Sequence, residues 1–209
     1  TEGRFLAQLP TTNIIFDRQT YAGVETAYNF KNKNSTAFPT LGLDAGLTIG
    51  YKTNIGNTDA DNSFAYIQPQ LIIDHKLTKS GSIVFATKIA GEALIGDDFE
   101  FYHAATIGGI DSLRGFRNER FTGKQSFYQN TDLRFPLGGL RTSLVPFRFG
   151  LTGSFDYGRV WVEDDTSNKW HNSVGASAWL IGAEAFTVNL GYFNSVDGGR
   201  VVFALGFSF

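Results

Sequence analysis

The sequence predicts an all-β fold, an antiparallel transmembrane β-barrel or the C-terminal part of one, with nine to ten strands present. Three observations predict it: apolar and polar residues alternate along the chain, aromatic residues end the apolar faces, and charge is sparse. Gly and Phe account for 24 and 20 of the 209 residues, and charged residues for only 18%, against about 25% in typical soluble domains. A sheet with one face on lipid and the other on a polar lumen has this composition.

The first four predicted strands cover residues 23–30, 41–52, 65–74 and 82–92. In each, apolar residues recur at every second position, which is the side-chain period of a β-strand. The apolar sets and the polar residues that oppose them are Val24, Tyr28 and Phe30 against Glu25 and Asn29; Leu41, Leu43, Leu47 and Ile49 against Asp44, Thr48 and Lys52; Ala65, Ile67, Leu71 and Ile73 against Gln68, Gln70 and Asp74; and Ile83, Phe85 and Ile89 against Ser82, Lys88 and Glu92.

Five more strands are predicted over residues 127–135, 145–156, 173–180, 186–192 and 201–209. A tenth could lie over residues 4–16, although Pro10 interrupts that segment. The apolar and opposing sets are Phe127, Leu133 and Phe135 against Asn130, Asp132 and Arg134; Val145, Phe147, Phe149 and Leu151 against Arg148, Thr152, Ser154 and Asp156; Val174, Ala176, Ala178 and Leu180 against Ser173, Gly175 and Ser177; Phe186, Val188, Leu190 and Tyr192 against Thr187, Asn189 and Gly191; and Val201, Phe203, Leu205, Phe207 and Phe209 against Val202, Ala204, Gly206 and Ser208.

A soluble β-sandwich or lipocalin-like barrel also alternates, with its apolar face turned to a core. Strand length favours the membrane, because these segments approach the roughly 9–11 residues that a tilted strand needs to cross a bilayer. The charges on the polar faces suit a wet lumen. The chain contains no Met, which indicates an already processed or trimmed chain. Residues 1–9 show no signal peptide.

The connection over residues 96–122 is far longer than an ordinary loop and is rich in apolar residues, so we expect it to be functional rather than disordered. It contains residues 108–116, Gly-Gly-Ile-Asp-Ser-Leu-Arg-Gly-Phe. Two later segments have recognisable patterns as well. They are residues 130–136 (Asn-Thr-Asp-Leu-Arg-Phe-Pro) and 155–161 (Phe-Asp-Tyr-Gly-Arg-Val-Trp).

Taken in order, these segments resemble the BamA/TamA-type outer-membrane protein assembly superfamily, the bacterial surface antigen barrels. The resemblance covers roughly residues 96–209, and residues 1–95 match only as generic barrel strands. It implies a single barrel domain over residues 1–209, forming the C-terminal part of a sixteen-stranded barrel, with loop 96–122 folded inward. The implied loop motif is Gly108, Gly109, Leu113, Gly115 and Phe116, and the implied C-terminal β-signal is Phe203, Leu205, Phe207 and Phe209.

In that family the loop Arg meets acidic residues on the inner wall, which here would pair Arg114 with Asp132 and Asp156. The alternation supports this independently, because both Asp residues lie on the polar faces of their strands. A guanidinium stays charged and can bond two carboxylates through its fork. Gly115 is expected to let the backbone turn sharply at the loop tip.

The implied function is insertion or translocation of polypeptides at the outer membrane, bacterial or organellar. The alternatives are a passive solute pore, a purely structural anchor, and an anchor or exporter for a missing passenger domain. Expected partners are the lipid bilayer and lipopolysaccharide, client outer-membrane polypeptides and other assembly-machinery subunits. A net charge of −2 gives no footprint for nucleic acid.

We expect no enzyme, cofactor or metal. The three His residues are scattered without metal-ligand spacing. Ser154 lies within a predicted strand rather than on a nucleophile elbow. The luminal carboxylates are balanced by Lys52, Lys88, Arg134 and Arg148, as in an ordinary channel wall.

Overall fold

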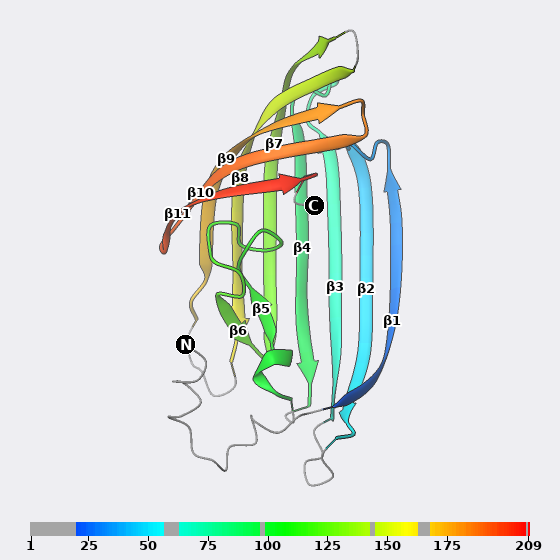
Figure 1. Ribbon diagram of the computed structural model, residues 1–209, viewed down its shortest axis with the longest axis vertical. Coiled ribbons are helices and arrows are strands. Elements are labelled where there is room, and N and C mark those ends of the chain that lie inside the picture. The colour runs from blue at the N-terminus through cyan, green and yellow to red at the C-terminus, as the bar shows by residue number, and fades with distance from the viewer. Residues whose placement is uncertain (1–19, 57–62, 97–98, 143–144, 163–167, 208) are drawn as a thin grey trace.

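The computed structural model describes residues 20–56, 63–96, 99–142, 145–162, 168–207 and 209. Nine long strands form one antiparallel sheet in the order β1-β2-β3-β4-β7-β8-β9-β10-β11, which curves into an open wall (Figure 1). The strands are β1 (Tyr21–Lys33), β2 (Leu41–Asn54), β3 (Ser63–Lys76), β4 (Val84–Ile95), β7 (Gln125–Arg141), β8 (Pro146–Trp161), β9 (His171–Gly182), β10 (Phe186–Ser195) and β11 (Gly198–Leu205).

The nine strands predicted from alternation are confirmed, each within the expected part of the chain. Most extend beyond their predicted ends, because the ladder continues after the apolar pattern fades. The segment at 4–16, considered as a tenth strand, lies outside the described residues. Among those residues, no helix is long and apolar enough to span a membrane.

The last strand differs from the prediction, because β11 ends at Leu205 instead of continuing to Phe209. Gly206 follows with a φ of +96°, and this left-handed residue breaks the alternation of faces. Phe203 and Leu205 point outward and are exposed, whereas Phe207 turns inward and packs against Phe38 and Trp179. The chain after Gly206 therefore lies on the concave side of the sheet, not on its lipid-facing side.

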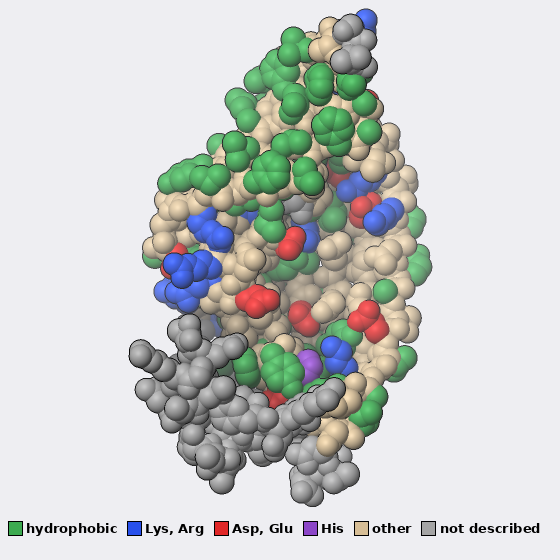
Figure 2. All heavy atoms as spheres, in the orientation of Figure 1, with side chains coloured by type: hydrophobic (Ala, Val, Ile, Leu, Met, Phe, Trp, Pro, Cys, Tyr) green, Lys and Arg blue, Asp and Glu red, His purple; other side chains and the backbone are tan. Residues whose placement is uncertain are grey.

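The two faces of the sheet differ in polarity as predicted. Large apolar side chains stand exposed at alternate positions on the convex face, for example Leu47 and Ile49 on β2 and Leu190 and Tyr192 on β10. Charged side chains gather on the concave side (Figure 2). An exposed apolar face of this extent is costly in water and is expected where the solvent is lipid.

Loop 96–122 lies inside the curve of the sheet, in front of β7 and β8 (Figure 1). It contains a short 3₁₀-helix, η2 (Phe101–His103), and its strand β5 (Ala105–Ile107) pairs with β6 (Phe121–Gly123) in a second, two-stranded sheet. The sequence did not predict these two short strands. They give the loop a rigid base from which residues 108–120 project along the inner wall.

Candidate functional site

The tip of the loop is a compact turn. Gly108 and Gly109 have φ values of +123° and +95°, a region that side-chain-bearing residues rarely adopt. The Gly109 N–H donates to the Leu113 carbonyl at 3.1 Å, and the Phe116 N–H donates to the same carbonyl at 3.0 Å. These bonds place Arg114 at the point where the turn meets the wall.

Gly115 lies within the turn closed by the Phe116 N–H and the Leu113 carbonyl, but its φ is not positive, so the turn itself does not require glycine. The role of Gly115 is close approach. A Cβ on Gly115 would lie 2.5 Å from Cβ of Ser173 on β9. The Gly115 N–H donates to Ser173 Oγ at 3.2 Å, and the Gly115 carbonyl accepts from Ser195 Oγ at 2.8 Å. Only glycine lets the loop backbone reach β9 and β10 at this distance.

Apolar contacts hold the loop on either side of Arg114. Leu113 and Phe116 are fully buried and form one cluster with Ile107 of β5. Three partly buried side chains pack against this cluster. They are Phe121, Tyr128 and Val160.

The guanidinium of Arg114 lies between two carboxylates. Its Nε donates to Asp156 at 3.0 Å (Oδ2) and 3.2 Å (Oδ1), and its Nη2 donates to Asp156 Oδ1 at 2.5 Å and to Asp132 Oδ1 at 2.9 Å. The main-chain N–H of Arg114 also donates to Asp156, at 3.0 Å. Arg114 is 3% exposed, and Asp132 and Asp156 are 2% and 0% exposed. The structure thus brings together the three residues singled out in the sequence. We call Arg114, Asp132 and Asp156 the loop anchor.

Each carboxylate has a further donor on the wall. Ser154 Oγ donates to Asp132 at 2.7 Å, and Ser173 Oγ donates to Asp156 at 3.2 Å. Asp132 lies on β7 and Asp156 on β8, so Arg114 ties the loop to two neighbouring strands. Burial alone would lower the pKa of the Arg114 guanidinium, but Asp132 and Asp156 outweigh burial and raise its pKa. The guanidinium is therefore a fixed positive charge.

A second buried guanidinium continues the network. Arg134 is fully buried, donates to Asp74 at 3.1 Å and lies 3.9 Å from Asp132. Lys33 on β1 then lies 3.4 Å from Asp74 and 3.1 Å from Asp44. Charges of alternating sign therefore run from the loop across β8, β7, β3, β2 and β1.

The C-terminal segment lies against both guanidinium groups. Arg134 Nη2 donates to the Phe209 carbonyl at 3.2 Å, and the Phe207 ring lies 4.2 Å from the Arg134 guanidinium carbon. The Arg114 guanidinium carbon is 4.6 Å from the Phe193 ring centre and 5.8 Å from that of Phe209. These rings cover the charges and supply cation–π contacts. Of the expected β-signal, Phe207 and Phe209 thus face the loop anchor, while Phe203 and Leu205 face outward.

Several residues that hold the loop were not singled out as site residues in the sequence. Asn130 Nδ2 donates to the Ser112 carbonyl, and Lys88 Nζ donates to the Asp111 carbonyl at 3.2 Å. Asn130 could have been found, because it shares the inward face of β7 with Asp132, two residues away. Ser173 and Ser195 could not, since only the pairing of β9 and β10 brings them to the loop.

The sequence led us to expect an ordinary wet channel wall. This expectation is wrong for the part of the wall that the loop and the C-terminal segment cover. Asp74, Asp132, Arg134 and Asp156 are each at most 2% exposed, because the loop and the C-terminal segment cover them. Arg148 does not balance these charges. It lies at the end of the sheet, 40% exposed in its side chain, and pairs with Glu184 at 3.0 Å.

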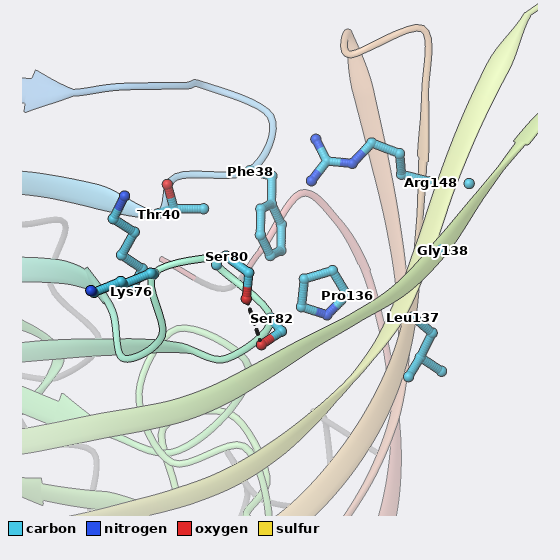
Figure 3. A pocket seen from close by; sticks show the side chains of 12 residues that line it. Phe38, Thr40, Lys76, Ser80, Ser82, Pro136, Leu137, Gly138 and Arg148 are labelled. Carbon is cyan, nitrogen blue, oxygen red and sulfur yellow. Dashed lines mark hydrogen bonds between the residues drawn. The ribbon is translucent and has the colours of Figure 1, made fainter.

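An open cavity of about 590 Å³ lies at that end of the sheet, with Arg148 in its lining (Figure 3). The β3–β4 turn forms one side, where Ser80 Oγ and Ser82 Oγ are 3.1 Å apart. Phe38 and Arg148 lie opposite, with the guanidinium carbon 5.1 Å from the ring centre. The lining mixes polar side chains with the apolar residues Phe38, Pro136 and Leu137 at the strand ends. Within the described residues, no group of three or more His, Asp or Glu side chains is placed to hold a metal ion.

Comparison with known proteins gives a family and a fold. The model of the Omp85 superfamily domain matches residues 16–193. Among solved structures, BamA from Haemophilus ducreyi lacking POTRA domains 1–3 is similar, with a TM-score of 0.64 and 18% sequence identity. The alignment covers 88% of this chain and 42% of that chain, so the chain spans less than half the length of that relative. No curated protein matches. The predicted fold class, an all-β antiparallel sheet of the barrel type, is confirmed.

Proposed function

The chain belongs to the Omp85 superfamily of outer-membrane barrels of the assembly and translocation type, and on this premise we propose that it aids the insertion or translocation of polypeptides at the outer membrane. The observation that carries the proposal is that loop 96–122 lies against the inner wall, with Arg114 held between Asp132 and Asp156. We call the loop in this position the seated loop. The client is an outer-membrane polypeptide in an extended conformation.

The edges of the sheet supply a physical route. Among the described residues, β1 and β11 each pair on one side only. An unpaired strand edge presents N–H and C=O groups that can template an incoming strand by β-augmentation. The β11 edge also presents Val201, Phe203 and Leu205 outward, so a client strand added there would continue the lipid-facing surface.

The role of Arg114 is to brace the wall next to this edge. The loop contacts β7 and β8 through the two carboxylates, β9 through Ser173 and β10 through Ser195. Arg200 on β11 donates to the Phe116 carbonyl as well. A seated loop therefore holds the last five strands of the sheet in one curvature, while the outer edge of β11 remains open to a client.

The test is client folding into vesicles that contain the protein, comparing wild type with Arg114→Ala. Arg117→Ala is the matched control, because Arg117 lies in the same loop but is exposed. The proposal expects Arg114→Ala to slow client folding and Arg117→Ala to leave it unchanged.

A conductance recording on the same vesicles separates assembly from a passive pore. If Arg114→Ala changes steady ion conductance and leaves client folding at the wild-type rate, the protein is a pore and the assembly proposal is wrong. The burial of Asp132, Arg134 and Asp156 under the loop and the C-terminal segment favours assembly over conduction.

A further inference from the structure

The wall has a local defect between β3 and β4. The two strands pair from Ala65↔Ile95 to Ile67↔Ala93 and again from Gln70↔Ala90 in the same register, but the two positions between are unpaired. Pro69 lies in this gap and has no N–H to give to the ladder. On the concave side, the Gln68 and Glu92 side chains bond each other at 3.0 Å across the gap.

Gly91 lies opposite Pro69 and leaves bare backbone on the convex face. A Cβ on Gly91 would lie 2.5 Å from the Ser126 carbonyl oxygen of β7, so the close approach of β4 and β7 requires glycine here. The missing side chain opens a groove of about 420 Å³ on the convex face. We call it the Gly91 groove; its outward-pointing walls are Ile67, Leu71, Ile89, Ala93, Phe127 and Trp161.

Phe127 and Trp161 line one end of the groove, and the cation Arg159 lies beside these two rings. Phe127 and Trp161 belong to a cluster with Trp170, whose ring centre is 6.0 Å from that of Phe127 and 6.2 Å from that of Trp161. Aromatic clusters on the outside of a barrel mark the level of the lipid headgroups. Arg159 pairs with Phe127 across the β7–β8 ladder, and its guanidinium carbon is 5.0 Å from the Trp161 ring centre.

We propose that the Gly91 groove binds one acyl chain of an anionic phospholipid, whose phosphate meets Arg159. The groove is continuous with the exposed apolar face that the bilayer covers, so lipid chains are the molecules in contact with it. Lipid tails gain no hydrophobic free energy by moving from bilayer to groove, and retention instead comes from dispersion contacts with the groove walls and from the phosphate contact. A guanidinium bonds phosphate through its planar fork.

The test is native mass spectrometry of the whole protein released from nanodiscs of phosphatidylglycerol, phosphatidylcholine or their equimolar mixture. The wild type is expected to retain one lipid, with phosphatidylglycerol favoured roughly ten-fold, the ratio that one charge-assisted contact provides. Ala93→Phe fills the groove and is expected to lose the lipid. Ala178→Phe adds the same ring to the lipid-facing side of β9, away from the groove, and is expected to retain it.

Arg159→Gln is expected to retain a lipid but to lose the preference for phosphatidylglycerol. Migration of unheated samples on SDS gels checks that each variant is folded. If folded Ala93→Phe retains as much lipid as the wild type, the Gly91 groove is not the lipid site. The proposal is also overturned if the wild type carries a second copy of the chain instead of a lipid. Equal retention of the two lipids by wild type overturns the role of Arg159. None of these results depends on client folding, so the site can fail while the proposed assembly function stands.

Discussion

Replacing Arg114 with Ala tests whether the loop anchor contributes substantially to the free energy that keeps loop 96–122 against the wall. We call this contribution the clamp. The substitution removes every side-chain donor between the loop and the two carboxylates, the shortest being 2.5 Å to Asp156 and 2.9 Å to Asp132. Breaking a buried ion pair by removing one partner costs about 3–5 kcal/mol, because the other charge stays buried.

The remaining donors put the expected loss at the lower end of that range. After the change, Asp156 still accepts from the main-chain N–H of residue 114 and from Ser173, and Asp132 still accepts from Ser154. We therefore expect the seated loop to lose about 3 kcal/mol, which raises the open population roughly a hundredfold.

Proteolysis of the bilayer-embedded protein measures this population. Phe116 is fully buried in the seated loop, so chymotrypsin can cut after Phe116 only when the loop opens. Where reclosing is faster than cleavage, the cleavage rate follows the open population. Arg114→Ala is expected to accelerate this cut roughly a hundredfold, and Arg114→Lys by less, because an ammonium keeps the charge but not the fork.

Arg117→Ala is the control for a change in the same loop that touches no buried carboxylate. An acceleration below about threefold in folded Arg114→Ala corresponds to less than about 0.7 kcal/mol. That result would refute the clamp, since the apolar contacts of Leu113 and Phe116 would then seat the loop without Arg114.

Four further substitutions, in three predictions, extend the test with the same proteolysis assay. Gly115→Val is expected to unseat the loop, because a Cβ there collides with β9; normal protection would show that the close approach is not required. Asp156→Asn is expected to weaken the loop more than Asp132→Asn, because Asp156 accepts four bonds from Arg114 and Asp132 one; the reverse order would contradict the geometry. Asp197→Asn removes an exposed pair with Arg120 and is expected to change protection by less than about 1 kcal/mol, so a larger loss would mean that the loop tip is held from outside.

The sequence by itself determined the strands and their faces. Side chains alternate with period two along a strand, so the positions of Val24, Leu47 or Leu190 assign the lipid-facing side without any knowledge of pairing. The same parity placed Asp132 and Asp156 on one inner wall. Their partner, Arg114, came from the resemblance of its motif to a known family, because no local pattern says where a long loop folds.

Only the tertiary structure decided what the inner wall does with its charges. The packing of loop 96–122 and of the chain after Gly206 converts a polar face into a dry network, in which Arg134 and Asp74 are as buried as a hydrophobic core. Glycine is required at position 115 because the backbone there lies next to Ser173, and at position 91 because β4 and β7 approach each other closely. The close approach at position 91 also leaves the Gly91 groove open. These features depend on contacts between segments far apart in sequence, and local periodicity carries no information about such contacts.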